Sequence, residues 1–142
     1  WRIGYIAAPE WIVKGCNKLQ GQYTSGPCSV SQKAAEFAYT ANQQCVEDMR
    51  QAFERRRDLI VKLCKEIPGL EVNVPQGAFY LWIRALEPDA QAFSERAKSL
   101  ELMLVASDSF GVPGWVRAGT CVSRDTIDRS ASAWAALAAS YR

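Results

Sequence analysis

The chain has 142 residues, of which 49% are hydrophobic and 23% are charged, so it is long enough to bury the core of one domain. Its formal net charge is only +2, and its basic residues form no stripe, which argues against binding to nucleic acid. The sequence contains neither an apolar run of about 20 residues nor a secretory leader, so we expect a soluble protein.

The cysteine and histidine content limits the chemistry further. The chain has no histidine, which excludes serine and cysteine triads that use an imidazole. Its five cysteines form no C-x-x-C pair, so no metal site is predicted. An odd number of scattered cysteines favours free thiols in a reducing compartment, and we therefore expect a cytoplasmic location.

The first 30 residues predict one strand, one helix and a loop. Residues 1–8 are apolar apart from Arg2, which predicts a strand, and Pro9 then opens a helix that is expected to end at Gly21. Residues 20–29 are small and polar and predict a loop. Because the chain starts without a methionine in what resembles a strand already in progress, we expect it to be a piece of a longer polypeptide.

Residues 29–141 predict helices packed on a small mixed sheet, an α/β fold of the α+β small-domain type. Apolar spacing of three to four residues predicts helices at 29–40, 42–67 and 124–141, and a further helix that starts at 88 and includes residue 97. The charge-rich middle of the helix at 42–67 is expected to face solvent. Apolar runs predict strands at 70–74, 78–83, 102–106 and 115–122. Core positions are expected for six aromatic residues, namely Trp11, Phe53, Phe79, Trp82, Trp115 and Trp134.

Arg117 lies in the middle of the last predicted strand, between Val116 and Ala118. An unpaired charge costs several kcal/mol to bury, so this guanidinium needs an anion or water. From local sequence alone, a structural salt bridge or a solvated edge position is favoured. The alternative is a small carboxylate ligand, because the planar fork of a guanidinium matches a carboxylate with two hydrogen bonds.

Four segments together resemble the C-terminal part of a class I/II aminotransferase, the pyridoxal-phosphate enzymes of fold type I that include aspartate aminotransferase. These are W-R-I-G-Y at residues 1–5, the loop around residues 23–27 followed by Gln32, P-Q-G-A-F-Y at 75–80, and S-F-G-V-P-G-W-V-R at 109–117. Any one of them is weak, but all four occur in the family's order and cover essentially the whole chain.

The resemblance implies a role for three residues. Arg2 corresponds to the arginine that grips the phosphate of pyridoxal 5'-phosphate, and Arg117 to the arginine that binds the substrate α-carboxylate. Thr24 lies in a loop that contacts the active site of the other subunit in this family, which makes it a candidate cofactor contact. In this family, the lysine that forms the Schiff base lies about eight residues before the arginine that matches Arg2. This sequence starts at Trp1 and does not include that position. No catalytic residue is therefore assigned, and the chain alone is expected to be inactive.

The resemblance also sets the expected domains, partners and reaction. Residues 1–30 are expected to be a remnant of the large cofactor-binding domain, and residues 31–142 to form the small C-terminal domain with its connecting helix. The complete enzyme is expected to be a homodimer that transfers an amino group between an amino acid and a 2-keto acid. Gln20 stands where aspartate aminotransferases place an arginine for the second substrate carboxylate, which argues against that clamp here.

Two alternatives remain open. One is a lyase or synthase that uses the same cofactor on the same scaffold, because a fold does not determine the reaction type. The other is a non-catalytic effector or dimerisation domain that resembles an aminotransferase. Formation of glutamate from 2-oxoglutarate distinguishes a transaminase from the first alternative, and an upstream basic helix-turn-helix segment supports the second.

Overall fold

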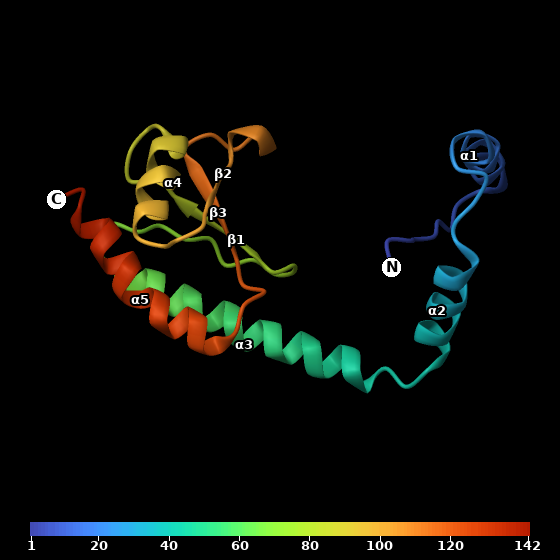
Figure 1. The fold of residues 1–142 in the computed structure, drawn as a ribbon, viewed down its shortest axis with the longest axis horizontal. Coiled ribbons are helices and arrows are strands. Elements are labelled where there is room, and N and C mark those ends of the chain that lie inside the picture. The colour runs from blue at the N-terminus through green and yellow to red at the C-terminus, as the bar shows by residue number, and fades with distance from the viewer. The chain divides into compact units, whose positions relative to one another are not determined.

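The computed structural model describes all 142 residues and divides them into two units, Trp1–Cys45 and Val46–Arg142 (Figure 1). The predicted boundary at residue 30 concerns the domains of the complete enzyme and stays a prediction. In chain order the elements are α1 (Glu10–Tyr23), α2 (Ser29–Thr40), α3 (Gln44–Glu66), β1 (Tyr80–Arg84), α4 (Ala90–Ser99), β2 (Val105–Ala106), the 3-10 helix η1 (Asp108–Phe110), β3 (Trp115–Gly119) and α5 (Arg124–Ala139).

The first unit contains two helices and no strand. The strand predicted for residues 1–8 is wrong, because a strand needs a hydrogen-bonded neighbour and this unit offers none. Helix α1 runs through Gly21 to Tyr23, two residues beyond its predicted end, whereas α2 has the predicted bounds. In the two helices only Ser31 is buried.

The first unit therefore has no apolar core of its own. Its large apolar side chains are mostly exposed, including Trp1, Tyr5, Ile6, Trp11, Leu19, Tyr23, Val30, Phe37 and Tyr39. The expectation that Trp11 is a core residue is wrong, since 75% of its surface is accessible. Exposed apolar surface of this extent is typical of a face that another protein segment covers.

The second unit contains an antiparallel sheet with the strand order β1-β3-β2. The expected fold class is confirmed, but no pair of neighbouring strands is parallel, so the sheet is not mixed. The reason is that α4 carries the chain from β1 to β2 in the same direction, and β3 then inserts between them and runs opposite to both.

The predicted strand at residues 70–74 is reduced to a single bridge between Val72 and Ile83. Backbone hydrogen bonds from Arg84 to Glu71 and from Asn73 to Trp82 still hold this segment along β1. The Trp82 N–H donates to the Asn73 side chain at 2.7 Å, and this side-chain bond replaces a regular bond of the ladder.

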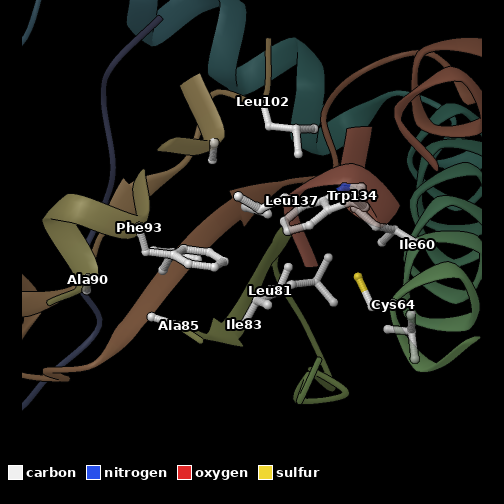
Figure 2. Close-up of a cluster of buried hydrophobic side chains, with 14 of the residues drawn as sticks. Ile60, Cys64, Leu81, Ile83, Ala85, Ala90, Phe93, Leu102, Trp134 and Leu137 are labelled. Atoms are coloured by element: carbon white, nitrogen blue, oxygen red, sulfur yellow. The ribbon is translucent and has the colours of Figure 1, made fainter. Parts of the chain in front are cut away.

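The core lies against one face of the sheet (Figure 2). Alternation along β1 and β3 directs Leu81, Ile83, Val116 and Ala118 to that face. Helices α3, α4 and α5 contribute Ile60, Cys64, Phe93, Trp134 and Leu137 to the same cluster. The opposite face carries the alternate residues of the two strands, which include Tyr80, Trp82 and Arg117.

Helix α3 combines a buried C-terminal part with a charged N-terminal part. Ile60, Val61 and Cys64 are buried, whereas Arg50 forms ion pairs with Glu47 and Glu54 near the start of the helix. The hydrogen bonds from Arg50 lower the pKa of Glu47 to about 2. No helix of the chain has both the length and the apolar character that crossing a bilayer requires.

Candidate functional site

Arg117 lies on the side of the sheet that faces away from the core. Its neighbours Val116 and Ala118 are buried in the core, so alternation places the Arg117 side chain on the opposite face, where it is half-buried. No carboxylate lies within ion-pair distance of its guanidinium. The structural salt bridge that local sequence favoured is therefore absent, which leaves this charge available to a ligand.

Two aromatic rings hold the guanidinium. Its Cζ atom lies 4.3 Å from the centroid of the Tyr80 ring and 4.5 Å from the centroid of the Phe110 ring. Both distances are within the range of a cation–π interaction. The Trp82 ring packs edge-on against Phe110 at 5.9 Å, and Trp82 pairs directly with Arg117 in the sheet.

The segment before Tyr80 is fixed by backbone contacts. The Thr120 N–H donates to the Phe79 carbonyl at 2.8 Å, and the buried Thr120 hydroxyl donates to the same oxygen at 3.2 Å. The Phe79 ring stacks on Phe53 of α3 at 5.7 Å and touches the Tyr80 ring at 4.6 Å. Tyr80 is thus positioned from both sides, by β3 and by α3.

A tight turn positions Phe110. Gly111 follows the 3-10 helix in the left-handed conformation, with φ 74°, and its N–H donates to the Asp108 carbonyl at 3.0 Å. Gly114 has φ 76° and returns the chain into β3. The glycines of the S-F-G-V-P-G-W-V-R segment are therefore required by the geometry that brings Phe110 onto Arg117.

Arg2 belongs to the first unit, and its side chain is exposed and forms no ion pair. Its φ of 63° places a non-glycine residue in the left-handed region, as do Ser25, Ala78 and Glu101. Such conformations cost about 1–3 kcal/mol and cluster at functional sites. Three of these four residues lie in segments that carry the family resemblance.

Thr24 is the C-cap residue that directly follows α1, and it is exposed. Its N–H donates to the Gln20 carbonyl at 3.0 Å, and its hydroxyl accepts a hydrogen bond from the Gln20 side-chain amide. Gln32 donates to the Pro27 carbonyl at 2.9 Å and so closes the loop between α1 and α2. Gln20 and Gln32 therefore fix the backbone around Thr24, whose predicted role stays a prediction.

Comparison with models of protein families matches residues 1–133 to aminotransferase class I and II. The chain belongs to this family. The resemblance to aminotransferases of fold type I that the four segments indicated is confirmed.

Individual relatives of this aminotransferase chain agree with the family match. An aspartate aminotransferase of Geobacillus stearothermophilus is 39% identical over 136 residues, which are 90% of this chain and 35% of the relative. A bifunctional aspartate aminotransferase and glutamate/aspartate-prephenate aminotransferase of Petunia hybrida is 37% identical over 143 residues, 89% of this chain and 30% of the relative. The chain spans about a third of the length of these curated relatives.

Solved structures show the same likeness. A tetra mutant of the aspartate aminotransferase of Thermus thermophilus matches 96% of this chain and 39% of its own with a TM-score of 0.90 and 30% identity. The aromatic aminotransferase of Pyrococcus horikoshii matches 99% of this chain and 39% of its own, with a TM-score of 0.89 and 29% identity.

The contacts of the guanidinium were not predicted from the sequence. Tyr80 and Phe110 lie in two of the four segments that carry the resemblance, but no role was predicted for either of them. Of the aromatic residues expected there, only Trp134 is fully buried; Phe79 is exposed, and Phe53, Trp82 and Trp115 are half-buried. The available signal was the alternation of Tyr80 and Trp82, which places both on one face of a strand beside Arg117.

Proposed function

We propose that this chain is the C-terminal part of a pyridoxal-phosphate-dependent aminotransferase, which transfers an amino group between an L-amino acid and a 2-keto acid. One observation carries the proposal. The Arg117 side chain is half-buried and its guanidinium contacts two rings, yet it has no carboxylate partner in the chain. The family and the names of the relatives supply the class of reaction.

Arg117 binds and orients the substrate α-carboxylate in this proposal. The rings of Tyr80 and Phe110 both lie within 4.5 Å of the Arg117 Cζ atom, and the guanidinium N–H groups form no hydrogen bond within the chain. A carboxylate accepts two of these N–H groups in parallel, which fixes both the position and the orientation of the amino acid. Partial burial strengthens the bond, because fewer water molecules compete for the charge.

Arg2 contributes to cofactor binding. The dianionic phosphate of pyridoxal phosphate is a good partner for its guanidinium, which is unpaired in this chain. Thr24 is a second candidate contact, because its hydroxyl accepts a bond from Gln20 and keeps its own proton to donate to a phosphate oxygen. When bound, the cofactor supplies the electron sink for removal of the α-proton.

The remaining groups of the active site come from the rest of the complete enzyme in this proposal. They include the Schiff-base lysine, so the activity belongs to the complete enzyme and not to this chain alone. We propose a homodimer, in which Thr24 contacts the site of the partner subunit. L-Aspartate is the first amino acid to test, since the relatives from Geobacillus and Petunia are named for aspartate.

The proposal is tested with two alanine variants of the complete enzyme. Arg117→Ala removes the carboxylate partner, and losing one member of a buried charge pair costs about 2–5 kcal/mol, so kcat/KM for L-aspartate is expected to fall by about 30-fold or more. The cofactor absorbance should remain. Arg2→Ala should instead release cofactor on dialysis while the KM for L-aspartate stays within a few-fold of the wild type.

Two outcomes contradict these roles. An unchanged kcat/KM in Arg117→Ala excludes Arg117 as the carboxylate partner, and full cofactor occupancy of Arg2→Ala after dialysis excludes the phosphate role. The reaction type is tested separately, by incubating the complete enzyme with L-aspartate and 2-oxoglutarate. A transaminase forms glutamate in equal amount to the keto acid produced, whereas a lyase or an effector domain does not.

A further inference from the structure

We propose that Tyr80 and Phe110 are positioning residues, which fix the plane of the Arg117 guanidinium before substrate binds. This inference rests on the proposed function and adds two residues that act through Arg117. A free arginine side chain has several rotatable bonds, and ordering it on binding weakens affinity. A guanidinium that is already held in the binding orientation avoids that loss.

The geometry supports a clamp rather than a chance contact. Tyr80 begins β1 and Phe110 ends η1, so the two rings come from separate elements, and each lies within 4.5 Å of the Arg117 Cζ atom. Cations lie over ring faces, where the electrostatic attraction is greatest. The N–H donors of the guanidinium form no hydrogen bond within the chain, so they remain available for a carboxylate.

The rings are themselves held in place. Trp82 packs against Phe110, and Phe79 packs against Tyr80, while Thr120 fixes the Phe79 carbonyl with two hydrogen bonds. The plane of Arg117 is thus set by the sheet and by the turn that ends at Gly111. Rigid support of this kind is what a preorganised binding group requires.

Packing in the apolar core does not explain where the rings of Tyr80 and Phe110 lie. Tyr80 is 38% exposed and Phe110 is 48% exposed, and both lie on the face of the sheet opposite to the core. Neutral rings also suit this site better than an acid does. A carboxylate from the protein would hold Arg117 equally well, but it would compete with the substrate carboxylate for the same N–H groups.

The test measures the affinity of the complete enzyme for succinate by isothermal titration calorimetry. Succinate carries carboxylates but neither an amino nor a keto group, so it binds without reacting. Phe110→Leu removes the ring but keeps an apolar side chain, and we expect its Kd for succinate to rise about tenfold, which corresponds to about 1.4 kcal/mol. Tyr80→Leu is expected to have a similar effect.

Conservative variants distinguish positioning from general packing. Phe110→Tyr and Tyr80→Phe keep a ring over the guanidinium, so their Kd values should stay within about twofold of the wild type. The same leucine substitutions in an Arg117→Ala background should produce no further loss, since the rings act only through the arginine. Thermal unfolding of each variant checks that the domain remains folded.

The outcomes separate this inference from the proposed function. If Arg117→Ala itself leaves the Kd for succinate unchanged, the proposed carboxylate role is wrong. If Arg117→Ala weakens binding but both leucine variants bind as the wild type does, only the positioning role is overturned. An equal loss from Phe110→Leu with and without Arg117 also overturns it, because the ring then acts by another route.

Discussion

At the scale of single residues, Arg96 and Arg117 of the second unit both lie over aromatic rings, but in different surroundings. The Arg96 Cζ atom lies 4.6 Å from the centroid of the Tyr141 ring, and the Tyr141 hydroxyl donates a hydrogen bond to Glu87. That cluster contains its own acid. The rings around Arg117 have no acid beside them, so this guanidinium has no carboxylate partner within the chain.

Tyr141 gives a pH-dependent prediction at this scale. Burial, together with the hydrogen bond to Glu87, raises the pKa of Tyr141 to about 12 from its ordinary value of about 10. The folded state therefore holds the phenolic proton more tightly than the unfolded state does. The resulting stability is fully present below pH 10 and is lost as the pH rises toward 12.

We expect the urea midpoint of the wild-type chain to fall between pH 10 and pH 12 more steeply than that of Tyr141→Phe, which has no proton to lose. The measurement is urea denaturation, followed by circular dichroism, at several pH values from 8 to 12. Tyr39→Phe, at an exposed tyrosine of the first unit, is the matched control and should follow the wild type. Parallel curves for Tyr141→Phe and the wild type would show that the folded state does not perturb this group.

At the scale of elements, helix starts differ between the two units. Helices α4 and α5 have side-chain caps: Asp89 accepts from the N–H groups of Gln91 and Ala92, and Ser123 accepts from the Thr126 N–H at 3.1 Å. Helices α1 and α2 begin without a side-chain cap. These two helices therefore gain little stability from caps or from burial of apolar side chains within their own unit.

Ser123→Ala tests the contribution of the cap to α5. Loss of an N-cap hydroxyl typically costs about 0.5–2 kcal/mol, so we expect the free energy of unfolding to fall by about 1 kcal/mol. Ser132→Ala, at an exposed position in the same helix, is the control and should change it by less than about 0.5 kcal/mol. Equal effects of the two substitutions in urea denaturation would exclude a capping role.

At the scale of the whole molecule, the apolar core lies in one of the two units. The second unit buries Phe93, Trp134 and the apolar faces of β1 and β3, whereas the first unit buries no large apolar side chain. Burial of apolar surface is the main source of folding stability. Stability is therefore expected to be distributed unequally along the chain.

Limited proteolysis of the 142-residue chain measures this difference. Trypsin should cut first in the first unit, after Lys14, Lys18 or Lys33, and leave a longer-lived fragment that contains residues 46–142. Mass spectrometry of a digestion time course identifies the fragments. Cleavage after Arg84 or Arg117, within the sheet, at the same rate as cleavage after Lys33 would contradict the prediction.

The sequence by itself determined which segments are helical, where most helices begin and end, and which family the chain belongs to. Helix α2 was predicted with the correct bounds because its periodicity is local and its flanking loop is rich in turn-forming residues. Arg117 was identified because a permanent charge inside an apolar strand conflicts with its surroundings, and that conflict is visible in the sequence alone.

Only the tertiary structure decided how the strands pair and what surrounds Arg117. Strand direction depends on where α4 returns the chain, and residues 1–8 have the composition of a strand but no neighbour to pair with. Tyr80 and Phe110 are 30 positions apart in the sequence, and their rings contact one guanidinium because β1 and β3 are adjacent. Contacts of this kind arise from non-local pairing, which periodicity and composition do not encode.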